Sequence, residues 1–160
     1  MAKKKKIAWN EAHGPAQNAR KQLPKLAVEY FEEVRGALAK NPPPDELHPL
    51  RLASKHFRYA LELFRHCYAA GLEERIEELK SVQDLLGDCN DAVASRQRID
   101  KALRSQPAAR ARMRQYLDGL AQEKAAEFRK HWAGNFDAPG KEEWWTGYLK
   151  RNARPPVKAK

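Results

Sequence analysis

The sequence is poor in cysteine, with Cys67 and Cys89 as the only two in 160 residues. Neither belongs to a Cys-x-x-Cys pair or to a cluster of cysteine and histidine at metal-ligand spacing. This scarcity argues against a disulfide framework and against a zinc centre. We therefore expect no metal and no cofactor, and a reducing cytoplasm as the localisation.

Long apolar runs are also missing, since no stretch approaches the roughly 20 apolar residues that cross a bilayer. The beginning, MAKKKKIAWNEAHG, is charged but lacks the apolar run of a signal peptide. We expect a protein that is neither secreted by a signal peptide nor membrane-spanning. The alternation of polar and apolar residues that is typical of strands does not stand out either. The expected fold class is therefore all-α.

Four amphipathic segments with helical spacing are present instead, separated by turn signals such as KNPPPDE and SQP. The second is predicted to begin between Asp45 and Pro49 and to end at Gly71. The four segments cover about residues 15–40, 45–71, 72–104 and 107–135. Because short connections join them, the prediction is one domain, an antiparallel up-and-down four-helix bundle.

The two ends differ from this bundle in composition. We predict a flexible basic N-terminal segment over residues 1–12, the bundle over 13–135, and a C-terminal extension over 136–160 that ends in a basic tail. The N-terminal segment contains Lys3 to Lys6. The extension contains KEEWWTGYL, with Trp144, Trp145 and Tyr148 close together. Two interpretations stay open for these aromatic residues, a cap that packs on the bundle and a contact between subunits.

Charge of one sign predominates, because 31 Lys and Arg residues against 21 Asp and Glu residues give a net charge of +10. Such a surface attracts polyanions, and nucleic acid, an anionic membrane and inorganic polyphosphate all qualify. Its most regular concentration lies in LHPLRLASKHFRYALELF, residues 47–64. There the steps between cationic or protonatable residues are three, four and three. We call these four residues the basic row: His48, Arg51, Lys55 and Arg58.

The spacing of the basic row places it within about 80° on one face of a helix, with apolar residues on the other side. The row spans about 15 Å, so a linear chain of phosphates can run along it. No acidic residue lies between Glu46 and Glu62, whereas helices that are merely soluble usually intersperse acids with bases. The alternative interpretation is a solvated charged face opposite a core face.

Two motifs resemble those of the CHAD domain. They are H-x-x-R-x-x-x-K-x-x-R-Y-x-x-E-x-F from His48 to Phe64 and LKSVQDLLGDCND from Leu79 to Asp91, and the resemblance covers about residues 18–100. It implies a non-catalytic, purely helical module that binds inorganic polyphosphate, with bacterial members associated with polyphosphate granules. By position it implies phosphate contacts from the basic row together with Tyr59 and Lys80, and Glu62 as a residue that orients Arg58.

The chain departs from this family in one respect. Members usually contain two four-helix repeats, and this sequence has one, which resembles the C-terminal half. Either the single repeat suffices, or a homodimer restores the two-repeat arrangement.

Two other basic residues each have two possible roles. Lys80 flanks the apolar stripe of the third segment, so its side chain reaches either water or the phosphate site. Arg20 aligns with the apolar stripe of the first segment, so it either snorkels at the end of the bundle or contacts phosphate. Gln83 and Asn90 are expected to be buried amides bonded to neighbouring helices. The cations from Arg96 to Arg114 are expected to be mostly solvated. The acids Glu73, Glu74, Glu77 and Glu78 are expected to form a helix N-terminal face paired with nearby bases.

Two rival functions remain beside polyphosphate binding. Catalysis is not expected, because the sequence has no recognisable set of metal-holding carboxylates and no nucleophile with a base. Binding of an RNA or DNA backbone without sequence preference is the alternative function. Against it, aromatic residues do not interleave with the basic row except at Tyr59, and no helix-turn-helix, RNP or zinc pattern is present.

Overall fold

The computed structural model describes residues 6–156, and within them it confirms the all-α class: there are five α-helices and no strand. The helices are α1 (Pro15–Leu38), α2 (His48–Leu63), α3 (Ala70–Ala102), α4 (Pro107–His131) and α5 (Lys141–Arg151). Two short 3-10 helices, η1 (Pro44–Glu46) and η2 (Arg65–Cys67), flank α2, and a π-helical turn, η3 (Trp132–Phe136), continues α4. None of the helices in this part of the chain is long and apolar enough to cross a membrane.

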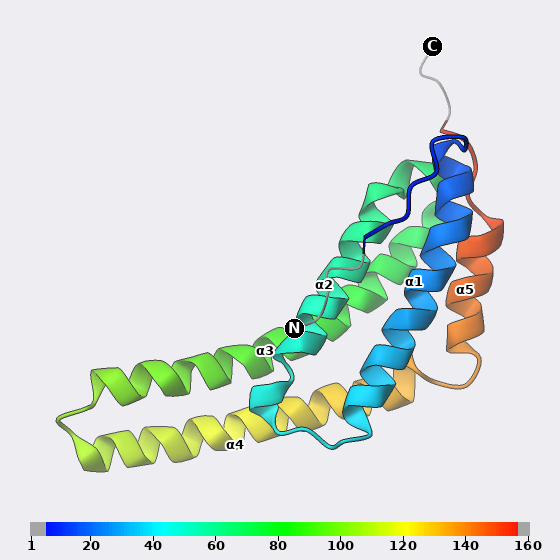
Figure 1. Ribbon diagram of the computed structural model, residues 1–160. Coiled ribbons are helices and arrows are strands. Elements are labelled where there is room, and N and C mark those ends of the chain that lie inside the picture. The colour runs from blue at the N-terminus through cyan, green and yellow to red at the C-terminus, as the bar shows by residue number, and fades with distance from the viewer. Residues whose placement is uncertain (1–5, 157–160) are drawn as a thin grey trace.

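The helices form a bundle with a long hairpin attached (Figure 1). At one end α2, α1 and α5 lie beside the first half of α3, whereas the second half of α3 runs away from them and pairs with α4. No residue from 93 to 116 is buried. We call this outer part of the hairpin, residues 93–116, the arm.

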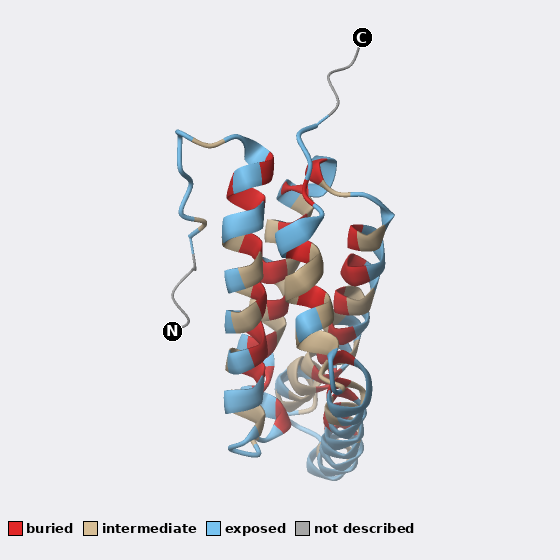
Figure 2. Ribbon diagram, turned by 90° about the vertical axis from the view of Figure 1, so that its right-hand side faces the viewer, coloured by how far each residue is buried: buried red, intermediate tan, exposed pale blue. Residues whose placement is uncertain are grey.

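The number of helices differs from the four predicted, because KEEWWTGYL forms α5 and packs along α1. Trp145 is completely buried. Its ring centroid lies 5.5 Å from that of Phe57 and 5.3 Å from that of Phe136. Figure 2 shows buried residues on the inward sides of the bundle helices. Trp145 therefore packs in the core, in agreement with the interpretation of the aromatic cluster as a cap that packs on the bundle.

Helix ends follow local chemistry at most positions. Pro15 occupies the first turn of α1 and Pro49 that of α2, where no backbone N–H is needed for helix hydrogen bonds. The predicted end of α2 at Gly71 is wrong, since α2 ends at Leu63 and Gly71 lies in the first turn of α3. A Cβ on residue 71 would lie 2.6 Å from Cε2 of Tyr148. The glycine there permits close approach of α5.

Arg75 attaches α5 to α3. Its side chain is almost fully buried, and its guanidinium lies 3.5 Å from the ring centroid of Trp144 and 3.9 Å from that of Tyr148. It donates hydrogen bonds to the carbonyl oxygens of Gly71, at 2.9 Å, and of Trp144, at 2.6 Å. Burial lowers the pKa of this guanidinium. The two aromatic faces and two carbonyls offset part of the lost hydration, whereas its buried Nε has no partner among the described residues.

Both chain ends contact the bundle within the described residues. Trp9 stacks on Phe64 with ring centroids 6.3 Å apart, and the backbone N–H of Arg154 donates to the carbonyl of Cys67 at 2.7 Å. These contacts differ from the mobile ends that we expected. Residues 1–5, which include Lys3 to Lys5 of the expected basic segment, and residues 157–160 of the expected basic tail lie outside the described residues. The division at 1–12, 13–135 and 136–160 stays a prediction.

Candidate functional site

The basic row lies along the part of α2 that the core leaves free. Leu50, Phe57 and Leu61 of the same helix are buried in the core. His48 is exposed, and the other three members of the row are half-buried. The structure therefore brings the four residues together on one partly exposed face, as their spacing along the helix requires.

Three members of the row, His48, Arg51 and Lys55, have no acidic partner among residues 6–156. Among residues 6–156, no carboxylate lies within 4.0 Å of Arg51 or Lys55. Nε of Arg58 lies 3.6 Å from Oε1 of Glu62, one turn further along α2, and this Nε has no hydrogen-bond partner among the described residues. The charge of Arg58 is thus partly balanced, whereas the charges of Arg51 and Lys55 are not.

Tyr59 lies beside the row and contacts two of its members. The ring is 5.6 Å from Nζ of Lys55 and 5.4 Å from the guanidinium carbon of Arg58, measured to the ring centroid. At exposed sites such cation–π contacts contribute about 0.5–1 kcal/mol each. Tyr59 remains 47% exposed, so its ring is accessible to a ligand.

Helix α3 lies next to the row and supplies a second stripe of residues, Gln83, Gly87 and Asn90. Nδ1 of His48 lies 3.0 Å from Oδ1 of Asn90. A Cβ on Gly87 would lie 3.8 Å from Nε of Arg51, so the arginine runs closely over the glycine. Asn90 bonds to a neighbouring helix, as expected, but it is half-buried rather than buried. The expectation for Gln83 is wrong, because its buried Oε1 has no partner within residues 6–156.

Acidic residues flank this stripe on α3. Asp84, Asp88 and Asp91 are all exposed, and their positions place them on the adjoining, outward part of the helix. An anion approaching from α3 would therefore meet like charge. The favourable approach to the row is along α2.

The two remaining candidate residues lie outside the row. Nζ of Lys80 is 2.6 Å from Oε1 of Glu77 on its own helix, so its charge is paired. Arg20 is exposed and lines a shallow hollow at the end of the bundle with Gln17 and Pro155. The structure thus brings Tyr59 to the row and leaves Arg20 apart from it.

The glutamates at the start of α3 are mostly paired, as expected. Glu73 binds Arg65 at 2.7 Å, and Glu78 binds Lys141 at 2.6 Å. Among the described residues, no group of three or more His, Cys, Asp or Glu residues could hold a metal ion.

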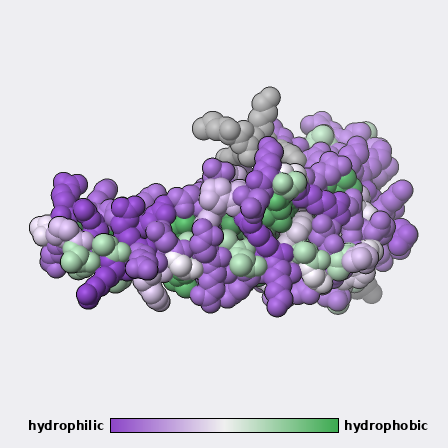
Figure 3. Space-filling view, turned by 90° about the horizontal axis from the view of Figure 1, so that it is seen from below, coloured by the Kyte–Doolittle hydropathy of each residue, from purple (hydrophilic) through white to green (hydrophobic). Residues whose placement is uncertain are grey.

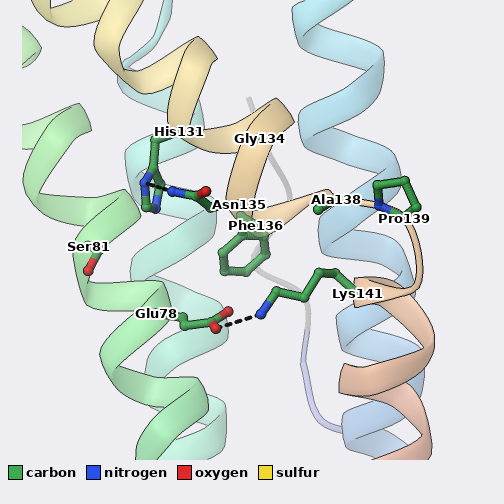
Figure 4. A pocket seen from close by; sticks show the side chains of 9 residues that line it. All are labelled: Glu78, Ser81, His131, Gly134, Asn135, Phe136, Ala138, Pro139 and Lys141. Carbon is green, nitrogen blue, oxygen red and sulfur yellow. Dashed lines mark hydrogen bonds and ion pairs between the residues drawn. The ribbon is translucent and has the colours of Figure 1, made fainter.

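A hollow of about 540 Å³ lies where η3 meets α3 and α5, and sequence reasoning missed it. Figure 4 shows His131 and Asn135 on one side and the Glu78–Lys141 ion pair on the other. His131 Nδ1 lies 3.0 Å from Asn135 Nδ2. Because Glu78 pairs with Lys141, the hollow offers little unbalanced positive charge. It suits a polyanion less well than the basic row does.

The described residues thus form an all-helical protein with a row of cations on one face of α2. Comparison with family models is more specific, because the model of the CHAD domain matches residues 2–100. The chain belongs to the CHAD domain family, which is associated with polyphosphate binding and is generally non-catalytic. The family resemblance noted from the two motifs is confirmed. Comparison with the curated proteins and with the solved structures gives no match.

The matched segment contains the whole basic row and the stripe of α3 beside it. It ends at residue 100, so α4 and α5 lie beyond it. The bundle of this chain thus includes a helix, α5, that lies outside the matched segment.

Proposed function

We propose that this protein binds inorganic polyphosphate, without catalysing a reaction and without a cofactor, along the basic row of α2. The observation that carries the proposal is the absence, within residues 6–156, of carboxylate partners for Arg51 and Lys55. Like charges one turn apart destabilise a helix slightly when nothing opposes them. A chain of phosphates along the row would remove that repulsion.

The chemistry of the row suits a linear phosphate polymer. Arg51 and Arg58 each present a planar guanidinium that can bind two phosphate oxygens, and Lys55 supplies a compact positive charge. His48 begins α2, where the positive end of the helix dipole favours an anion. Each step of the row advances the cation by about one helical turn, or about 5 Å, so successive cations meet successive parts of the polymer.

Tyr59, Lys80 and Arg20 complete the proposed contacts. Tyr59 holds Lys55 and Arg58 against its ring and so orients them. Lys80 would contact the polymer by exchanging the Glu77 carboxylate for a phosphate oxygen as its partner. Arg20, at the end of the bundle, would contact only a polyphosphate chain long enough to extend past the row.

The single repeat leads to a proposal about assembly and location. A twofold homodimer would place two basic rows in one particle and restore a two-repeat arrangement. We propose that such a dimer acts in the cytoplasm at polyphosphate granules. Sedimentation equilibrium tests the dimer directly, and a mass equal to one 18.4 kDa chain at micromolar concentration would contradict it.

Nucleic-acid binding is the second candidate function, and the exposure of Tyr59 favours it. A ring that is 47% exposed beside Lys55 and Arg58 could stack on a base while the row binds the backbone. Polyphosphate remains the better match, because within the described residues Tyr59 is the one aromatic side chain with a cation–π contact to the row.

A competition experiment separates the two functions. Labelled long-chain polyphosphate is bound at fixed salt and challenged with unlabelled polyphosphate, single-stranded RNA and single-stranded DNA at equal phosphate concentrations. The proposal predicts that unlabelled polyphosphate displaces the label at concentrations at least about tenfold lower than RNA or DNA. Equal displacement by RNA would favour the nucleic-acid function instead.

A further inference from the structure

The arm carries a concentration of positive charge that the basic row does not explain. Its 24 residues, 93–116, contain seven basic residues and one acidic residue, a net charge of +6, against +10 for the whole chain. None of them is buried. Figure 3 shows the arm, on the left, as mostly hydrophilic.

Two of the arm's basic residues have structural partners. Arg96 binds Asp118 of α4 at 2.9 Å and also Asp45 of η1, and these bonds raise the pKa of its guanidinium. It therefore ties the base of the arm to the bundle. Nε of Arg114 lies 3.5 Å from Oδ1 of Asp100, across the hairpin.

The other five basic residues of the arm have no acidic partner in the part of the chain that the structure describes. No carboxylate of residues 6–156 lies within 4.0 Å of any of them. We call these five residues the tip cations: Arg98, Lys101, Arg104, Arg110 and Arg112. A surface selected only for solubility usually mixes charges of both signs, whereas this one combines five uncompensated cations with a single acid.

The tip cations are separated from the basic row. Gly87 lies beneath Arg51 of the row. Along α3, Arg98 is 11 residues beyond Gly87 and 8 residues beyond Asn90, which contacts His48 of the row, and these separations correspond to about 17 Å and about 12 Å at 1.5 Å per residue. Both distances exceed the Debye length of about 8 Å at physiological salt. The exposed Asp88 and Asp91 lie between, so the positive surface is interrupted.

We infer that the tip cations form a second surface for linear phosphate polymers, so that one protein molecule bridges two strands of polyphosphate. This inference rests on the proposed function, because the first strand occupies the basic row. A polymer held on the row leaves the tip of the same molecule free for another strand. Multivalent contacts of this kind link long polymers into networks. Four of the five tip cations lie beyond the segment that the family model matches.

The test compares three variants with the unaltered chain by light scattering with long-chain polyphosphate and by titration with short-chain polyphosphate. The tip variant is R98Q/K101Q/R104Q/R110Q/R112Q. The matched control removes the same number of charges from exposed lysines elsewhere, K21Q/K25Q/K40Q/K130Q/K150Q. The third variant, R51A/R58A, changes the row alone.

The unaltered chain and the control should scatter light strongly at intermediate ratios of protein to long polymer, and scattering should fall when polymer is in excess. The tip variant should scatter at least about fivefold less, while its affinity for short chains matches that of the control within about twofold. Scattering by the tip variant equal to that of the control would overturn the inference. So would bridging of single-stranded RNA without bridging of polyphosphate.

The row variant separates the two proposals. Loss of short-chain binding in R51A/R58A supports the row as the first site, whatever the tip does. Full short-chain affinity in that variant would contradict the proposed function, whereas a change confined to light scattering in the tip variant bears on the bridging alone.

Discussion

Nδ1 of His48 lies 3.0 Å from Oδ1 of Asn90, which connects the first turn of α2 to the middle of α3. The contact fixes one end of the basic row against a neighbouring helix. It also places an amide at a point where a carboxylate would weaken the local positive potential.

Substitution of Asn90 should therefore weaken polyphosphate binding, and Asp should weaken it more than Ala. Asn90→Ala removes one hydrogen bond worth about 0.5–1.5 kcal/mol, so affinity should fall about twofold to tenfold. Asn90→Asp should weaken binding further because it adds a negative charge beside the row. Calorimetric titration measures both, with Gln97→Ala on the exposed surface of the same helix as the control. Unchanged affinity in both Asn90 variants would show that this end of the row is not used.

Gly87 gives a prediction with opposite effects on stability and binding. In Gly87→Ala the new Cβ has an ordinary contact with Arg51, at 3.8 Å, and the helix gains about 1 kcal/mol. The melting temperature should rise by about 2–4 °C with affinity unchanged. Gly87→Leu should displace the Arg51 side chain and weaken binding several-fold.

Gly71→Ala is the matched comparison, because its Cβ would lie 2.6 Å from the Tyr148 ring. Thermal denaturation should show a lower melting temperature for this variant. A rise in both alanine variants would contradict the packing of α5 against the start of α3.

Arg75 should be important for stability rather than for binding. Arg75→Ala removes a desolvated cation–π contact and two hydrogen bonds from a charged donor, a loss of about 3 kcal/mol. Arg75→Lys should lose less, since it keeps the charge but not the planar stack. Urea denaturation followed by circular dichroism measures the free energy of unfolding, with the exposed Arg98→Ala as control. A loss in Arg75→Ala no greater than in Arg98→Ala would contradict the role given to this residue.

The arm should be the least protected helical part of the chain. None of its residues is buried, so local opening exposes little apolar surface, whereas Ile76, Leu79 and Val82 of the same α3 are fully buried. Hydrogen exchange followed by mass spectrometry should show peptides from the arm exchanging at least about tenfold faster than peptides covering 76–86. Equal protection along α3 would mean that the hairpin is stabilised by contacts beyond those described.

Much of the helical pattern could be predicted because apolar periodicity reports local structure directly. Pro15 and the turn at KNPPPDE placed the bounds of α1 closely. The end of α2 was misplaced because a glycine after a helix also serves where another element approaches closely, as Tyr148 approaches Gly71. Only the tertiary structure distinguishes these two uses.

The basic row could be recognised from spacing alone, but its surroundings could not. Which face of α3 lies beside α2 depends on packing, so the position of Gly87 beneath Arg51 and the unpaired Oε1 of Gln83 appear only in the folded chain. The burial of Arg75 was missed for a similar reason. An arginine in a helix is usually solvated, and its stacking depends on an α5 that had not been predicted.

The most direct test of the central claim is the affinity of R51A/R58A for polyphosphate, measured by titration at several salt concentrations. The matched control is K25A/K40A, which removes two exposed cations away from the row. We predict at least about tenfold weaker binding for R51A/R58A, unchanged helicity, and a shallower dependence of log affinity on log salt, because fewer counterions are released. Affinity of R51A/R58A equal to that of K25A/K40A, with the same salt dependence, would contradict the claim that the basic row binds the polymer.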